Sequence, residues 1–445
     1  MNGCARYSPS TGTSTCNAPF SSDLAARGSS AFRFPDLNSS PDLRHTEGHM
    51  TDDTGLPFDL FSTTAGAPTR CSAERPVCPL ARTSLESTLF HHMEAKRSQA
   101  TANAEIARPV PPALPVPPAL PWTVRLQLFM LVGAYDLALR ADGTVNRFLF
   151  SFGDRQTRAS ARPDALGVRS ADVTVDASRG LWARVFSPAA DQAGSPLPVI
   201  VYTHGGGFAL LSPASTPLDG MCRRFCRELG AVVVSVNYRL APEHRCPAAY
   251  DDGVQVLRHL SATGLPDDLG VSVDLSRCFL VGDSAGGNIA HHVAQRWISS
   301  PPTSNSIRLA GIILLQPYFG GEERTEAELR LEGVAPVVNM QRSDWSWRAF
   351  LPEGTNRDHP AAHVTDENAE LPEGFPPAMV VVGGFDSLQD WQRRYAGVLQ
   401  RKGKSVQLLE FPEAIHAFYM FPELPDARKL VKEMKAFIQS SKSNL

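Results

Sequence analysis

From about residue 170 onward, short apolar runs alternate along the chain with longer stretches of helical character. Runs of four to eight apolar residues predict strands, and the stretches between them predict helices. The predicted strands are residues 171–175, 181–186, 198–202, 231–236, 278–281, 309–315, 378–382 and 405–411. The predicted helices are residues 217–229, 247–262, 285–299, 389–401 and 424–440.

The composition of these strands predicts how they pair. The later strands are nearly continuous in Val, Ile and Leu, which is typical of parallel strands that are covered on both faces. The first two strands read as an antiparallel hairpin. The pattern therefore predicts an α/β protein with a mostly parallel, doubly wound sheet. Residues 321–365, which contain Trp345, Trp347 and Phe350, interrupt the alternation and predict an insertion that forms a cap element.

The chain ahead of the sheet has a different character. Residues 1–107 are rich in Ser, Thr, Ala and Pro without a sustained apolar period, which predicts a disordered extension, and residues 108–121 form a proline-rich linker. A mostly apolar helix is expected to begin at Trp122, and residues 122–165 either form a lid over an active site or pack on the side of the domain. The catalytic domain is then residues 166–445. The apolar residues of the helix that need packing partners are Leu126, Phe129, Met130, Val132 and Leu137.

Charge and hydropathy narrow the range of partners. The 445 residues carry a formal net charge of −3, and Lys and Arg are scattered, so the chain offers no basic surface for nucleic acid. A small-molecule partner is expected. No run of about 20 apolar residues predicts a membrane span. The first 22 residues are rich in Ser and Thr and lack acids, as in transit peptides, but acids recur from Asp23 onward, so the sequence favours a cytoplasmic protein.

One short motif predicts a nucleophile. Residues 282–286 read Gly-Asp-Ser-Ala-Gly and lie between the predicted strand 278–281 and the predicted helix 285–299. A serine in such a strand–turn–helix setting occupies a strained turn, and glycines two positions to either side avoid clashes with neighbouring backbone. The sequence therefore predicts Ser284 as the nucleophile of an acyl-transfer reaction.

A serine nucleophile needs a base and an acid that orients the base. Of twelve histidines, His416 is the one that follows the strand ending at Val382, as the order serine, acid, histidine requires. Asp386 stands at the end of the strand before it and is the predicted acid. Asp390, one helical turn further on, remains the alternative.

A glycine run predicts the site for the developing negative charge. His204 is followed by Gly205, Gly206 and Gly207 directly after the predicted strand 198–202. Glycines allow backbone N–H groups to converge on one point, as an oxyanion requires. The loop is the predicted oxyanion hole, with Gly206, Gly207 and the N–H of Ala285 as donors, and His204 is expected to brace the loop. The sequence contains no phosphate-binding glycine motif.

These motifs carry a resemblance. His204-Gly-Gly-Gly-Phe208, Asn237-Tyr-Arg-Leu-Ala-Pro-Glu243, Gly282-Asp-Ser-Ala-Gly-Gly-Asn288 and the late Asp386 and His416 resemble the hormone-sensitive-lipase family of α/β-hydrolases. Within it the chain is similar to the plant carboxylesterase branch, which includes the gibberellin receptors. The similarity covers about residues 122–440. It implies an α/β-hydrolase fold, an N-terminal helical lid, no cofactor or metal, and short acyl esters as substrates.

The resemblance leaves two functions to weigh. The gibberellin receptors of this branch keep the serine, lose the catalytic histidine and carry a serine at the third glycine, whereas this chain has His416 and Gly207. The isoflavanone dehydratases place threonine at the nucleophile, where this chain has Ser284. The sequence thus favours a carboxylic ester hydrolase, and a small-molecule receptor on the same fold is the alternative.

Overall fold

A computed structural model describes residues 115–189, 195–266, 269–302 and 306–440. The extension predicted for residues 1–107, and the first part of the linker, lie outside these residues. All eight predicted strands are present. Their bounds are β1 (Val168–Asp176), β2 (Leu181–Pro188), β3 (Leu197–Thr203), β4 (Val232–Asn237), β5 (Val273–Asp283), β6 (Leu309–Leu315), β7 (Ala378–Phe385) and β8 (Val406–Ile415).

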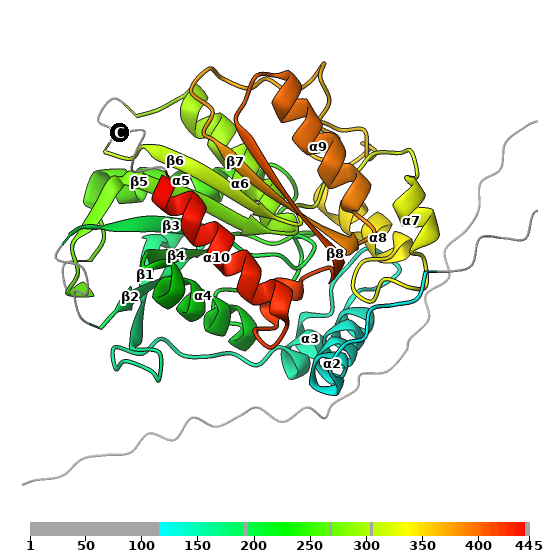
Figure 1. Ribbon diagram of the computed structural model, residues 1–445, viewed down its shortest axis with the longest axis horizontal. Coiled ribbons are helices and arrows are strands. Elements are labelled where there is room, and N and C mark those ends of the chain that lie inside the picture. Colours follow the sequence, from blue (N-terminus) through cyan, green and yellow to red (C-terminus); the bar gives the residue numbers. More distant parts are fainter. Residues whose placement is uncertain (1–114, 190–194, 267–268, 303–305, 441–445) are drawn as a thin grey trace, which may run out of the picture. The chain divides into compact units, whose positions relative to one another are not determined.

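The strands form one sheet in the order β1-β2-β4-β3-β5-β6-β7-β8 (Figure 1). β1 pairs with β2, and β2 with β4, in antiparallel register, which confirms the hairpin. Every later pair is parallel. All seven residues of β3 and of β6 are buried, as expected for strands covered on both faces. The mostly parallel sheet of an α/β-hydrolase fold is therefore confirmed.

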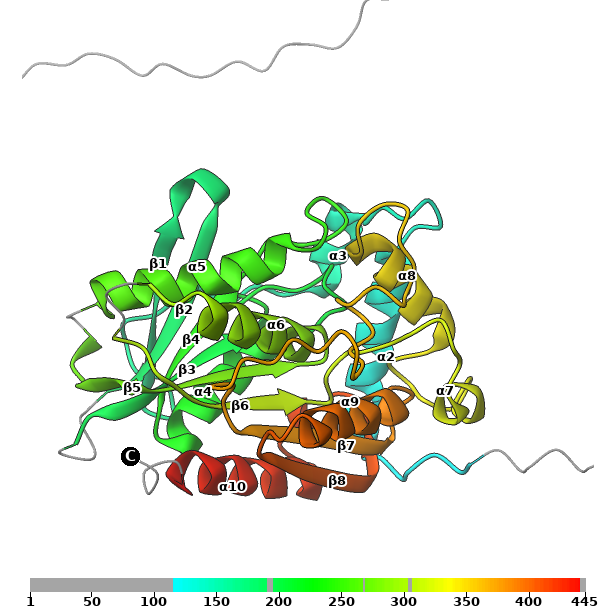
Figure 2. The ribbon, with the colours of Figure 1, turned by 90° about the horizontal axis from the view of Figure 1, so that it is seen from above.

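Helices cover both faces of this sheet. α4 and α10 lie in front of the sheet in Figure 1, whereas Figure 2 shows α5 and α6 along the opposite face. α9 lies beside α6, because the Tyr395 hydroxyl is 2.8 Å from Nδ1 of His291. Three of these helices have at least eight buried residues each, namely α4 (Thr216–Leu229), α5 (Ala248–Thr263) and α6 (Ala285–Ser299). The other two helices on the faces of the sheet are α9 (Gln389–Arg401) and α10 (Pro425–Ser440).

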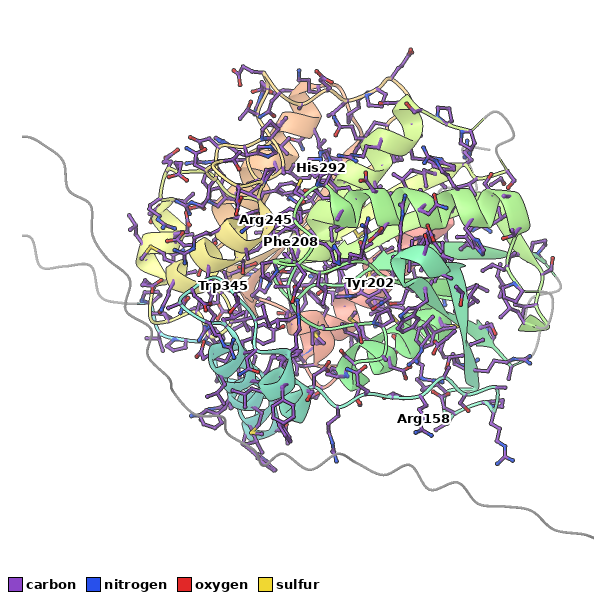
Figure 3. All side chains as sticks on the ribbon, turned by 180° about the vertical axis from the view of Figure 1, so that it is seen from behind. Arg158, Tyr202, Phe208, Arg245, His292 and Trp345 are labelled. Carbon is purple, nitrogen blue, oxygen red and sulfur yellow. The ribbon has the colours of Figure 1, made fainter. Side chains whose placement is uncertain are left out.

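Two further groups of helices lie near the carboxyl ends of the parallel strands. The first group is α2 (Trp122–Ala138) and α3 (Arg147–Gly153), and the second is α7 (Glu326–Arg330) and α8 (Met340–Phe350) from the insertion. α2 and α8 are side by side in both ribbon views (Figures 1 and 2). Trp345 marks their junction in Figure 3, where its indole N–H donates to the Arg140 carbonyl over 2.7 Å.

The packing expected for α2 was partly wrong. Five of its large apolar side chains face outward, and Phe129, for example, is 73% exposed. Val124, Leu128 and Ala138 are the buried residues of the helix. A single apolar helix pattern does not tell which of its faces meets the domain, and here the wider apolar face meets solvent. The exposed residues in this group are Trp122, Leu126, Phe129, Met130 and Leu137 on α2, with Phe148, Leu149 and Phe152 on α3.

Across the described ranges, no helix is both long enough and apolar enough to cross a bilayer. The longest apolar helix outside the core, α2, has 17 residues.

Candidate active site

The serine turn has the strained geometry that its motif predicts. Ser284 stands between β5 and α6 with φ 52° and ψ −121°, a conformation that side chains rarely adopt. A Cβ at Gly282 would lie 2.1 Å from the Gly286 carbonyl oxygen, and one at Gly286 would lie 1.9 Å from that of Thr203. Backbone contacts thus require both glycines. They allow the turn that raises the serine hydroxyl to the edge of the sheet.

Three residues from three loops form a continuous chain of hydrogen bonds. Nε2 of His416 lies 3.0 Å from Oγ of Ser284, and its Nδ1 lies 2.8 Å from Oδ2 of Asp386. His416 follows β8 and Asp386 follows β7, so the order of strands brings them together. Asp386 is completely shielded from solvent and His416 is 3% exposed. This is the arrangement in which a histidine can take a proton from a serine hydroxyl.

The rest of the Asp386 carboxylate is also occupied. Oδ1 accepts the N–H of Leu388 over 3.0 Å, and Oδ2 accepts a second bond, from Nε2 of Gln392, over 2.8 Å. Asp390, the alternative acid, instead accepts the N–H of Ala327 over 2.9 Å. The geometry therefore pairs Asp386, and not Asp390, with the histidine.

Three backbone N–H groups near Ser284 are available to a ligand. In the part of the chain that the structure describes, no hydrogen bond occupies the N–H of Gly206, Gly207 or Ala285. Gly206 and Gly207 have φ of 100° and 59°, in the region that favours glycine. Gly205 does not fit the role expected of it as part of the oxyanion hole. Its N–H donates to Oδ1 of Asp283 over 2.8 Å and is thus already used.

Asp283 anchors this loop from within the serine motif. Besides Gly205, its carboxylate accepts hydrogen bonds from the hydroxyls of Tyr202, which lies on β3 (Figure 3), and of Tyr419, the latter over 3.2 Å. Burial raises the pKa of Asp283 above its usual range, and the bonds from Tyr202 and Gly205 act in the opposite direction. No signal along the chain pointed to this role, because the partners of an acid next to the motif serine are not set by sequence spacing.

His204 lies behind the loop, as predicted for a bracing residue. Its Nδ1 is 2.8 Å from the Gly205 carbonyl oxygen, and its ring stacks on Tyr238 with 4.4 Å between centroids. Burial lowers the pKa of His204 to about 4, so the ring is neutral near pH 7.

A mostly apolar cavity of about 140 Å³ opens above Ser284. Its floor includes Gly206, Gly207 and His416, and its walls come from α2 and α8, so the two segments predicted as lid and cap both border it. α2 contributes Gln127, Leu131 and Tyr135, and Leu139 follows directly after it. α8 contributes Arg342, Ser343, Trp345 and Ser346. A mostly apolar cavity with a few polar groups at its floor is typical of a site for a small molecule.

Comparison with known proteins shows the family to which this chain belongs. The family model for the alpha/beta hydrolase fold matches residues 200–420. Gibberellin receptor GID1C of Arabidopsis thaliana is 45% identical over 323 residues, which are 69% of this chain and 91% of the receptor. Carboxylesterase 20 of the same plant is 36% identical over 315 residues, which are 67% of this chain and 93% of the esterase. The chain belongs to the plant carboxylesterase branch of the hormone-sensitive-lipase family.

Solved α/β-hydrolases extend the likeness beyond this branch. The Pyrobaculum calidifontis esterase is 28% identical with a TM-score of 0.54, over 71% of this chain and 90% of that chain. LAE6, an alpha/beta hydrolase enzyme from the metagenome of Lake Arreo, Spain, is 26% identical with a TM-score of 0.56, over 72% and 97%. The α/β-hydrolase fold of this chain is thus shared with an esterase and with another hydrolase of distant origin.

Proposed function

We propose that this protein is a carboxylic ester hydrolase with Ser284 as nucleophile, His416 as general base and Asp386 as the acid that orients it. The observation that carries the proposal is the unbroken hydrogen-bond chain from Ser284 through His416 to Asp386, at 3.0 and 2.8 Å. A receptor needs a binding cavity but does not need a base within reach of the serine.

The proposed reaction has two halves. His416 takes the proton of Ser284 as its oxygen attacks the ester carbonyl, and the N–H groups of Gly206, Gly207 and Ala285 stabilise the oxyanion. His416 then gives the proton to the departing alcohol, which leaves an acyl-enzyme. A water molecule repeats the attack, again with His416 as base, and releases the carboxylic acid and free Ser284. Asp386 keeps the imidazole in the required tautomer throughout.

A small-molecule receptor is the second candidate. The 45% identity to a gibberellin receptor favours it, and so does the wall of α2 residues over the cavity. Two residues count against it. His416 is present, and position 207 holds a glycine where the receptors have serine; a Cβ there would lie 2.8 Å from Oγ of Ser346, so that hydroxyl would have to rotate away.

One experiment separates the two. The full chain is incubated with p-nitrophenyl acetate, butyrate and octanoate, with the Ser284→Ala protein as control, and binding of a gibberellin is measured by calorimetry on both proteins. An esterase hydrolyses at least one ester with saturation kinetics that Ser284→Ala abolishes. Tight binding of the gibberellin without ester turnover would instead establish the receptor.

A further inference from the structure

One side chain holds the loop of His416 from both sides. Nε2 of Gln316 donates to the Ile415 carbonyl over 3.2 Å, and Oε1 of Gln316 accepts the N–H of Ala417 over 2.8 Å. Ile415 and Ala417 flank His416 along the chain. A single amide therefore fixes both peptide groups to which the histidine is attached.

This side chain crosses a strand to reach its partners. Gln316 follows β6 and His416 follows β8, and β7 lies between them in the sheet. The crossing depends on Gly383 of β7, because a Cβ at that position would lie 2.3 Å from Nε2 of Gln316. The amide is thus aimed over a neighbouring strand at the loop of the base, and not at a partner in its own strand.

The backbone of Gln316 has an unfavourable conformation. Its φ is 46°, in the left-handed region that side chains disfavour, and its N–H donates to the Val381 carbonyl over 3.0 Å. Strained residues of this kind persist where surrounding contacts hold them, and they gather at functional sites. Gln316 is completely buried, so water does not compete for its bonds.

We propose that Gln316 is a positioning residue for His416, which keeps the imidazole within hydrogen-bonding reach of Ser284. Gln316 is not among the residues that line the cavity, so it acts through the histidine loop and not on the substrate. The inference rests on the proposed function, because the position of His416 affects turnover when His416 is the base.

The decisive variant is Gln316→Met, which keeps the length of the side chain and the demands on the backbone but removes both hydrogen bonds. With the loop released, the ring spends less time at 3.0 Å from Ser284. Displacements of about 1 Å in an active site lower rates by up to about 100-fold. We expect kcat to fall by about 10- to 100-fold while KM for a p-nitrophenyl ester stays within about twofold.

A second variant guards against a simple loss of folding. Gln316→Asn keeps the amide and suits a positive φ, but it is one methylene too short to reach both Ile415 and Ala417. We expect its melting temperature to be near that of the wild type, with a kcat between those of the wild type and Gln316→Met.

Asn288 provides a matched control. It is also a completely buried amide with two hydrogen bonds, accepting from the Tyr250 hydroxyl and donating to the Ala361 carbonyl, each over 2.7 Å. Asn288→Leu therefore loses as many bonds as Gln316→Met but none at the histidine loop. We expect it to lower the melting temperature with little change in kcat at a temperature where it remains folded.

Labelling of Ser284 by a fluorophosphonate supplies a readout that does not require turnover. The rate should fall in Gln316→Met in parallel with kcat, and it should be unchanged in Asn288→Leu. Unchanged kcat and labelling in Gln316→Met, or equal losses in Asn288→Leu, would overturn the proposal. If the wild-type protein reacts with the fluorophosphonate but hydrolyses no ester, and Gln316→Met reacts more slowly, the esterase function is wrong and the positioning role remains. A wild type that does neither would overturn both.

Discussion

The guanidinium of Arg342 binds the carboxylate of Asp136 through two nitrogen–oxygen pairs, 2.7 and 2.8 Å long. The pair joins α8 to α2 beside the cavity. α2 buries few of its own side chains, so its hold on the domain depends on contacts of this kind. Asp136 itself does not line the cavity, whereas residues one turn or less away from it do.

Breaking the pair should loosen the wall of the cavity. Asp136→Ala should raise KM for apolar esters about fivefold, the equivalent of about 1 kcal/mol, and leave kcat within about twofold. The melting temperature should change little, because partly exposed ion pairs contribute at most about 1 kcal/mol to folding. KM is measured with p-nitrophenyl octanoate at low salt. Asp142→Ala, which removes an acid in the loop after α2, is the control, and equal KM values for both variants would exclude a lid role.

The serine and histidine should act as one unit. Ser284→Ala, His416→Ala and the double variant should each lower kcat by a similar factor, on the order of 10⁴ or more, because removing one partner already disables the other. Steady-state kinetics with a short-chain ester measure this. If the losses of the two single variants multiply in the double variant, the residues do not cooperate and the mechanism is wrong.

The acid should be identifiable by its effect on turnover. Asp386→Asn should lower kcat by about 10³- to 10⁴-fold without loss of the fold, because the amide favours the wrong imidazole tautomer. Asp390→Asn should cost far less, since its carboxylate binds the Ala327 N–H and not the histidine. Circular dichroism verifies the fold of both. The opposite ranking would assign the role to Asp390.

The oxyanion loop should not tolerate a side chain at its third glycine. Gly207→Ala places a Cβ 2.8 Å from the Ser346 hydroxyl oxygen, on a backbone with φ 59°. We expect kcat to fall by about 100-fold, which is the cost of one lost oxyanion donor. Adding Ser346→Gly removes the collision but not the strain, so part of the activity should return. A double-variant cycle measures this coupling, and strict additivity would show that the two positions are independent.

Acid should destabilise the fold through a buried histidine. Burial lowers the pKa of His292 to about 4, from an ordinary 6.5. Between these values the unfolded chain binds a proton that the folded chain does not, so stability is lost as the pH falls from about 6.5 to about 4. Between pH 6.5 and 4, the free energy of unfolding should fall less steeply with decreasing pH in His292→Gln than in the wild type. The two slopes should differ by up to about 1.4 kcal/mol per pH unit. Denaturant titrations measure the slopes. They should coincide above about pH 7, where the ring is neutral in both states, and a difference there would contradict the assignment.

The strands of the sheet, and the order of the serine, the acid and the histidine along the chain, were predictable from the sequence because each signal depends on residues that are neighbours along the chain. The runs of Val, Ile and Leu predict buried parallel strands, and the strand–turn–helix motif predicts the conformation of Ser284. The sequence distinguished Asp386 from Asp390 less clearly, because the two acids are only four residues apart. It depended on the rule that active-site residues follow strand ends, and the geometry agrees with that rule.

The residues that sequence analysis missed bind partners that are not their neighbours along the chain. Gln316, Gln392 and Arg342 each bind a partner at least six residues away, and two of them reach other strands or helices. No periodicity or motif marks a glutamine as the partner of a distant loop. The role of Gly205 was wrong for a similar reason, because its N–H is taken by a carboxylate 78 residues further along the chain.

Because α2 buries only three of its side chains, we expect it to be visible in hydrogen–deuterium exchange, a measurement that needs no turnover. A helix with three buried side chains, and no side-chain cap at its first turn, opens locally at a smaller free-energy cost than the strands beneath it. Its amide hydrogens should therefore exchange with deuterium well before those of β3 and β5. A molecule in the cavity touches Gln127, Leu131 and Tyr135 of the same helix and would slow that exchange. Deuterium uptake by α2 thus reports occupancy of the cavity, whatever the occupant and whether or not it is hydrolysed.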